Sequence, residues 1–462
     1  MSAKTYREYV AVQATDLFYQ IYTEQTDDEF RRFLGTHAPL SLLDNVTITR
    51  PSLSWPLVTY DSDGKPVRVP KLIVGLSHPQ DEAEPVLHSA LSELASGDVV
   101  VLGRGADPGA GDADHWCPIA PDQSAFGTRA AARGLIGADL LGQPPLSGRE
   151  VNVVVIDRGL NQQEIEDRFG VGRYGGGWPF TPQPGDPRPS QLPGQTSVED
   201  AAHGLMIARN ILDIAPEAVI WDLPLLPPRI TNIPLFLSEA NAAFIAMLND
   251  VDQRGGSWIL TNAWAVFDRQ SETPLGSYTE NLPSPTTLHP FTQEIADAID
   301  HKHDVIFCAG NCGEFCPDPR CGPADRGAGR SIWGANSYYR VLTVSAARTD
   351  GAWIGYSSQG PGQPNLSSPT HPGFSQKPDL CAPSGFREDG DAHRINTGTS
   401  AASGITAGVV AALRSKWPPQ AIKPEILNLI LNATARQPLP GSWNQRFGNG
   451  LLNIPQALAM LP

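Results

Sequence analysis

The chain has 462 residues and a formal net charge of −15, because 49 Asp and Glu outnumber 34 Lys and Arg. This acidic balance argues against nucleic acid or an anionic membrane as the main partner, since both favour a basic protein face. Hydrophobic residues make up 40% of the chain, enough to build a sizeable core and to exclude wholesale disorder. No apolar run reaches the roughly 18 residues needed to span a bilayer, so we also expect no membrane partner.

The N-terminal residues and the number of cysteines both indicate where in the cell the protein is found. The N-terminus has no apolar core of the signal-peptide type, because Glu8, Gln13 and Asp16 interrupt it. Six cysteines are also too few for a disulfide scaffold in a chain of this length. We therefore expect a cytoplasmic protein.

Residues 1–114 are predicted to form a smaller α+β region. Residues 1–36 carry apolar side chains at helical spacing, and residues 60–66 are typical of a hairpin turn between two strands. Strand-like runs at 71–75 and 98–102 enclose a helical pattern and predict a β-α-β-like unit. Residues 103–114 are rich in Gly, Ala and Asp and predict an exposed linker, which places the domain boundary at 114/115.

Residues 115–462 show a different pattern, in which buried strands alternate with helices. This alternation predicts an α/β domain with a doubly wound, mostly parallel sheet and helices on both of its faces. The strands are expected at 151–156, 218–223, 258–261, 304–308 and 340–345, and the helices at 204–212, 237–253 and 291–301.

Four polar residues lie at strand ends or helix starts of this domain. Asp157 follows a buried strand, His203 opens an amphipathic helix, Asn311 follows another strand, and Ser400 stands at the entrance of an Ala-rich helix. Taken alone, Asp157, His203 and Asn311 are more simply explained as cap or turn residues, whereas Ser400 fits a helix N-cap and a functional hydroxyl equally well. In parallel sheets such positions gather at one edge, and the order Asp, His, Ser matches one of the known serine-protease triads. No G-x-S-x-G pattern surrounds Ser400, which argues against an α/β-hydrolase.

The motifs around these residues resemble those of the subtilases, the subtilisin-type serine proteases, over residues 124–459. The segments at 155–159, 203–204 and 398–402 resemble the aspartate, histidine and serine motifs, and 309–311 resembles the oxyanion segment. Segments 356–361, 377–383 and 447–451 resemble three further family segments. The chain departs from the family pattern at Arg158, where Ser or Thr is usual, and in the residues that follow His203-Gly204 and Ser403.

The resemblance implies a role for each of these residues. Ser400 would be the nucleophile, His203 the general base, Asp157 the residue that orients His203, and Asn311 the oxyanion donor. The substrate would be a protein or peptide, bound along Ala263, Trp264 and Ala265, with Cys308, Ala309 and Gly310 lining the pocket before the cleaved bond. Trp264 could equally be an ordinary core residue. We expect no cofactor and assign no metal site, because no loop with calcium-ligand spacing stands out.

Several readings stay open on function. The first is an active serine endopeptidase that works through an acyl-enzyme. The second is a catalytically inactive subtilase fold that binds a peptide, and the third is a peptide-maturation enzyme that transfers the acyl group to an amine. Residues 1–114 could be a propeptide that inhibits the enzyme or a permanent accessory domain.

Four cysteines surround Asn311, namely Cys308, Cys312, Cys316 and Cys321. Their spacing allows a zinc site. It also allows reduced, buried thiols, or one disulfide, for which Cys316–Cys321 and Cys312–Cys316 are the expected pairings.

Overall fold

The computed structural model divides the chain into two compact units, Met1–Ala125 with Pro438–Pro440 and the remaining residues from Phe126 onward. The structure describes residues 5–14, 47–49, 55–60, 66–79, 99–106, 127–142, 146–272, 278–279, 288–370, 373, 375–388, 391–436 and 443–462. The predicted boundary at 114/115 lies outside these residues and stays a prediction.

The first unit contains an antiparallel sheet. Strands β4 and β5 both pair antiparallel with β1, which lies between them, and β2 and β3 both pair with β4. The bounds are β1 Thr5–Ala14, β2 Thr47–Thr49, β3 Trp55–Tyr60, β4 Pro66–Pro79 and β5 Val99–Ala106. The predicted hairpin around 60–66 is confirmed, since Tyr60 pairs with Pro66.

Two predictions for this unit are wrong. Residues 5–14 form strand β1 rather than part of a helix, because Thr, Tyr and Val prefer the extended pleated backbone. Residues 103–106 belong to β5 and pair with β1, so they are not linker. The helix expected between β4 and β5 lies outside the described residues.

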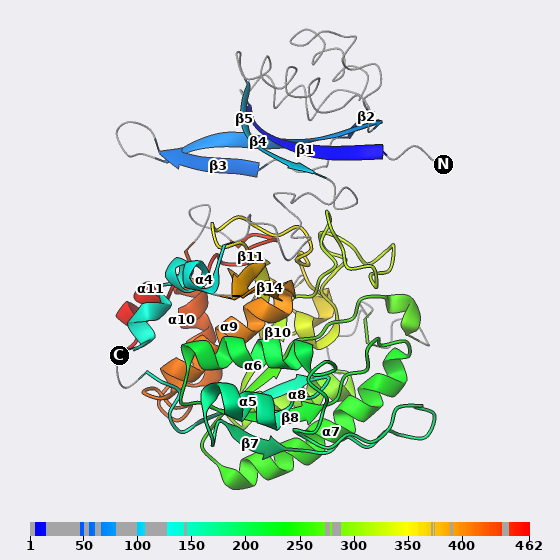
Figure 1. Cartoon of the computed structure of the whole chain (residues 1–462), viewed down its shortest axis with the longest axis vertical. Helices are drawn as coiled ribbons and strands as arrows, with labels where there is room; N and C mark the ends of the chain where they lie inside the picture. The colour runs from blue at the N-terminus through cyan, green and yellow to red at the C-terminus, as the bar shows by residue number, and fades with distance from the viewer. Residues whose placement is uncertain are drawn as a thin grey trace. The chain divides into compact units, whose positions relative to one another are not determined.

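The second unit is built on a seven-stranded parallel sheet (Figure 1), which confirms the predicted α/β class. The strand order is β12-β11-β10-β9-β6-β8-β7, and each predicted strand of this domain corresponds to one of these. The bounds are β6 Val151–Asp157, β7 Tyr174–Gly177, β8 Val219–Pro224, β9 Ser257–Asn262, β10 Asp304–Cys308, β11 Leu342–Ala347 and β12 Leu380–Pro383. The strands β13 Phe386–Glu388 and β14 Asp391–Asn396 form a separate hairpin.

Helices cover both faces of this sheet. Alternate residues of β6 face opposite ways, so Val153 packs with helices α6 and α9, whereas Val154 packs with α7 and α8. The α-helix bounds are α4 Arg129–Ile136, α5 Gln162–Phe169, α6 Ala202–Ile214, α7 Ile233–Arg254, α8 Pro290–Asp300, α9 Gly398–Arg414, α10 Pro424–Thr434 and α11 Ile454–Met460. Among the described residues, every helix is too short or too polar to cross a membrane.

Helices α6 and α9 approach each other closely through two glycines of α9. A Cβ atom at Gly404 would lie 3.3 Å from the Cα atom of Ile207, and one at Gly408 would lie 2.9 Å from the carbonyl oxygen of Ile211. Both contacts are tighter than ordinary packing, so only glycine fits without displacing α6. This contact matters for the site because α6 carries His203 and α9 carries Ser400.

Helix α9 is buried along its whole length and is anchored at its C-terminal end by a charge pair. The Arg414 guanidinium donates to both carboxylate oxygens of Asp304, each at 2.6 Å, and both side chains are buried. Asp304 begins β10, the strand that leads to Asn311. The pair therefore fixes the helix that carries Ser400 to the strand that leads to Asn311.

Candidate active site

The site begins at the carboxyl edge of the parallel sheet, where β6 ends in Asp157. The Asp157 carboxylate is fully buried, and its two oxygens lie 2.9 and 2.8 Å from Nδ1 of His203. It also accepts a hydrogen bond from the Arg158 backbone N–H at 2.8 Å. The residue after His203 must be small, because a Cβ at Gly204 would lie 2.8 Å from the Gly159 carbonyl oxygen.

The Asp157 carboxylate sets the protonation behaviour of His203. Burial lowers the pKa of His203, but the charge of Asp157 and its hydrogen bond outweigh burial and raise that pKa above its usual value. The positive charges of Arg320 and Arg158 act in the opposite direction and moderate the rise. The imidazole can thus take up a proton beside Asp157 more readily than an ordinary histidine.

Ser400 lies in the first turn of α9, and two side chains hold this turn in place. Tyr356 accepts the backbone N–H of Gly398 at 3.0 Å, and Ser384 donates to the Gly398 carbonyl at 2.7 Å. Gly398 itself has φ +76°, a conformation that other residues rarely adopt. The Ser400 hydroxyl donates to the Ala263 carbonyl at 3.1 Å in this rotamer. A hydroxyl at a helix N-terminus lies where backbone N–H groups favour negative charge.

Asn311 is oriented by Thr399, the residue before Ser400. Its Oδ1 accepts the Thr399 backbone N–H at 2.9 Å and the Thr399 hydroxyl at 3.0 Å. The same hydroxyl accepts the Gly310 backbone N–H at 3.0 Å. Because Oδ1 is committed to Thr399, the amide Nδ2 is the part of Asn311 left to donate. Thr399 lies within the predicted serine motif, but its role in orienting Asn311 was not predicted.

A cavity of about 250 Å³ connects these residues, and His203, Asn311 and Ser400 all line it. Four of the predicted substrate-binding residues line it as well, namely Ala263, Trp264, Ala265 and Cys308. Ala309 and Gly310 do not line it. Ala309 is fully buried and donates its N–H to Val344, and the Gly310 carbonyl accepts from Ser358.

Trp264 serves the core and the cavity together. Its ring packs against Phe236, Phe291 and Phe307 at centroid distances of 5.1, 5.7 and 5.6 Å, so most of it belongs to the core beneath α7 and α8. Only 4% of the residue is exposed, yet it also lines the cavity. Trp264 is therefore a core residue that also forms part of the cavity wall, and its role in binding substrate stays a prediction.

A profile of the Subtilase family matches residues 148–450, more than half of the chain. The chain belongs to the subtilase family. It is a subtilisin-like serine protease, as the sequence motifs predicted. A search among curated proteins finds no match.

Solved structures of three proteases resemble this subtilase. MycP1 from Mycobacterium smegmatis is 18% identical with a TM-score of 0.46, and the match covers 75% of this chain and 89% of MycP1. The prenylagaramide maturation protease PagA is 19% identical with a TM-score of 0.46, covering 71% and 99% of the two chains. A lanthipeptide protease is 17% identical with a TM-score of 0.47, covering 68% and 90%.

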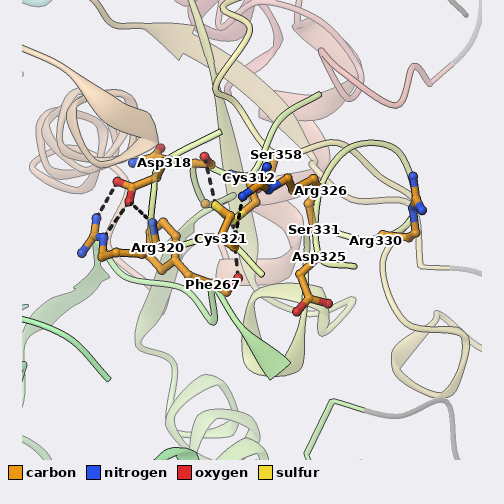
Figure 2. Close-up of a disulfide and its surroundings, with 12 residues drawn as sticks. Phe267, Cys312, Asp318, Arg320, Cys321, Asp325, Arg326, Arg330, Ser331 and Ser358 are labelled. Carbon is orange, nitrogen blue, oxygen red and sulfur yellow. Dashed lines mark hydrogen bonds and ion pairs between the residues drawn. A yellow bond between two sulfur atoms is a disulfide. The ribbon is translucent and has the colours of Figure 1, made fainter. Parts of the chain in front are cut away.

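Two predicted pairings in the cysteine cluster of this subtilase are wrong. Cys312 pairs with Cys321 across nine residues of sequence, and Figure 2 shows this disulfide in its surroundings. Cys316 is disulfide-bonded as well, so neither Cys316–Cys321 nor Cys312–Cys316 forms, and the four thiols cannot together bind zinc. The pairing depends on the path of the loop, which the cysteine spacing does not reveal. An oxidising compartment suits this disulfide, while the expected cytoplasmic location stays a prediction.

Cys308 remains a free thiol beside Ser400. Burial raises the pKa of this thiol to about 11, so it is protonated at neutral pH. A protonated thiol is a poor nucleophile. Cys308 therefore contributes shape to the wall of the cavity and does not compete with the Ser400 hydroxyl.

The Asp157–His203 contact predicts a pKa that can be measured. In Asp157→Asn the pKa of His203 should fall below that of the wild type, because burial and the two arginines remain while the carboxylate charge is gone. Histidine ring signals followed by NMR across pH 4–9 would give both values. Asp252→Asn is the matched control, since Asp252 faces His301 and His303 instead. An equal His203 pKa in wild type and Asp157→Asn would contradict the electrostatic role of Asp157.

Proposed function

We propose that this subtilase is a serine endopeptidase that cleaves peptide bonds through an acyl-enzyme on Ser400. The observation that supports it best is the short Asp157–His203 contact on a cavity that Ser400 and Asn311 also line. No other pair of groups at the cavity combines a hydroxyl nucleophile with a base oriented by a buried carboxylate among the described residues.

The chemistry follows from these groups. The Ser400 hydroxyl turns from Ala263 toward His203 Nε2, gives its proton to that nitrogen, and attacks the peptide carbonyl. Asp157 holds the Nδ1–H tautomer and stabilises the imidazolium that forms. Asn311 Nδ2 and the Ser400 backbone N–H donate to the oxyanion. His203 then passes its proton to the leaving amine, and water hydrolyses the ester by the same steps.

Removing the nucleophile is the direct test. Ser400→Ala should abolish peptidase activity and labelling by a fluorophosphonate probe while leaving the fold intact, because one hydroxyl is lost from a buried turn. Cleavage of unstructured proteins and probe labelling would be measured beside circular dichroism. Ser403→Ala is the matched control, since Ser403 lies one turn further along α9 and donates to the Ser400 carbonyl. Unlabelled wild-type protein would favour the inactive peptide-binding fold instead, and amide products formed with added amines would favour acyl transfer.

The oxyanion donor has a separate signature. Asn311→Ala should lower kcat by about 10²-fold or more with little change in KM, because the donor acts on charge that develops only in the transition state. Steady-state kinetics on one peptide would measure both constants. Thr399→Val should show a smaller loss of kcat, since it frees the Asn311 amide to rotate. An unchanged kcat in Asn311→Ala would mean that another group donates to the oxyanion.

We also propose that residues 1–114 restrain this activity as a propeptide does. The support is that this region forms a compact unit of its own, built on a separate antiparallel sheet. Deleting residues 1–114 should raise the rate of peptide cleavage, measured at equal concentrations of labelled active site. A fall in both rate and labelling would show that the region is a structural part of the enzyme.

A further inference from the structure

The charge of the cavity differs in sign from that of the whole chain. The chain carries −15, yet three arginines line the cavity, Arg158, Arg229 and Arg320, against one carboxylate outside the Asp157–His203 pair, Asp268. The Asp268 carboxylate already accepts the Gln270 backbone N–H at 3.0 Å. The three arginines come from three separate segments of the chain, so no single helix or loop repeat explains their meeting.

Arg320 is held in a fixed direction at the end of the disulfide loop. Its Nε and Nη2 donate to the two oxygens of Asp318 at 2.9 and 2.8 Å, and its guanidinium lies 4.3 Å from the centre of the Phe267 ring (Figure 2). This pairing uses one edge of the fork and leaves the Nη1 edge free to donate. The Asp318 backbone N–H donates to the Asn311 carbonyl at 2.8 Å, so Arg320 is tied to the oxyanion segment.

The loop beneath Arg320 is closed by Cys312–Cys321. Cys312 directly follows Asn311, and Cys321 directly follows Arg320, so the disulfide joins the two segments next to the residues that line the cavity. A charged side chain loses less freedom on binding when it is already held in place. The loop thus presents one guanidinium edge at a defined place beside Ser400 and Asn311.

Arg158 and Arg229 line the cavity from the loops after β6 and β8. Arg158 directly follows Asp157, and its side chain is 36% exposed, with the nearest carboxylate, the exposed Asp200, 3.9 Å away. Arg229 follows Pro227 and Pro228, is exposed, and has no ion pair with another described residue. Burial would raise the pKa of the Asp318 carboxyl, but Arg320 and, more weakly, Arg229 lower it, so Arg229 lies near enough to act on the same region.

Space for a chain extends past Arg158. A second groove shares Arg158, Leu226 and Pro228 with the cavity, so these three residues border both spaces. A peptide that runs from the cavity into this groove passes Arg158. The field of the arginines also reaches the reacting groups, because Arg320 and Arg158 both act on the pKa of His203.

We propose that the cleft selects peptides with Asp or Glu beside the cleaved bond, and that Arg158, Arg229 and Arg320 determine this specificity. The proposal rests on the proposed endopeptidase function. A substrate carboxylate binds guanidinium groups through paired, charge-assisted hydrogen bonds, which an amide side chain reproduces only in part. In a largely acidic protein, three arginines at one cavity also favour the approach of an acidic peptide at that place.

The test compares matched peptides that differ by one side chain. A fluorogenic peptide library places Asp, Glu, Asn, Gln or Lys at each of the positions flanking the cleaved bond, and kcat/KM is measured for each peptide. Acidic peptides should exceed their amide partners by about 10-fold or more at one position at least, because each exposed charge pair contributes about 2- to 5-fold. The preference should shrink between about 0.02 and 0.5 M salt, since salt screens exposed charges.

Variants identify the residues responsible. Arg158→Gln, Arg229→Gln and Arg320→Gln should each lower the acidic-to-amide ratio by about 2- to 5-fold, and Arg320→Lys should retain part of it. Arg229→Gln is the variant least expected to disturb the fold, because Arg229 is exposed and has no ion pair with another described residue. A loss of preference in this variant therefore cannot be attributed to misfolding. Arg149→Gln is the control and should keep the ratio. Arg149 is 71% exposed and precedes β6, at the opposite edge of the sheet from Asp157.

The results distinguish a failure of the proposed acidic specificity from a failure of the proposed endopeptidase function. An acidic-to-amide ratio near one, with amide peptides still cleaved and Ser400 still labelled, overturns the specificity while the endopeptidase function stands. Equal losses for all peptides in the arginine variants show that the arginines only support the loop, and likewise overturn it. Absence of both cleavage and labelling overturns the endopeptidase function and the specificity together.

Discussion

The arrangement of the site depends on one constraint, the burial of α9 along its entire length. A helix inside the domain can present a reactive hydroxyl only at an end, so Ser400 lies in its first turn. The opposite end is held by Arg414, whose charge is matched by Asp304 at the start of β10. Removing one partner of such a pair leaves an uncompensated buried charge, which costs about 3–5 kcal/mol. The strand that Asp304 begins leads to Asn311, so a single helix relates the proposed nucleophile, Ser400, to the proposed oxyanion donor, Asn311.

Much of the catalytic domain could be predicted from the sequence because its signals are local. Strands such as Val151–Asp157 are continuous β-branched runs, and such runs form the centre of parallel sheets. Asp157, His203, Asn311 and Ser400 each follow a strand or open a helix, and the topology of a parallel sheet gathers those positions at one edge. The motif around Ser400 predicts the site well because its neighbours also have structural roles there. Gly398 adopts the positive φ that the turn requires, and Thr399 orients Asn311.

The features that the sequence did not reveal depend on contacts between distant segments. Residues 5–14 were predicted as helix from apolar spacing, but β1 lies between β4 and β5, where pairing on both sides favours the strand. The Cys312–Cys321 pairing depends on the path of the loop between them. The place of Arg320 at the cavity was not predicted, because it depends on contacts with Asp318 and Phe267 that form only in the folded chain. The backbone of Gly310 contacts Thr399 and Ser358, a role that the sequence did not reveal, and its predicted role in binding substrate stays a prediction.

The close contact of α6 and α9 through Gly404 and Gly408 has an evolutionary consequence. His203 and Ser400, the proposed base and nucleophile, lie on two helices that meet at Gly404 and Gly408 with no side chain from either glycine between them. The distance between the two helices therefore cannot change through gradual changes in side-chain size at these two positions. Even one added methyl at Gly408 would clash with the backbone of α6 at Ile211. Substitutions in the loops around the cavity leave this helix pair unchanged, so we expect changes in substrate preference to arise in those loops.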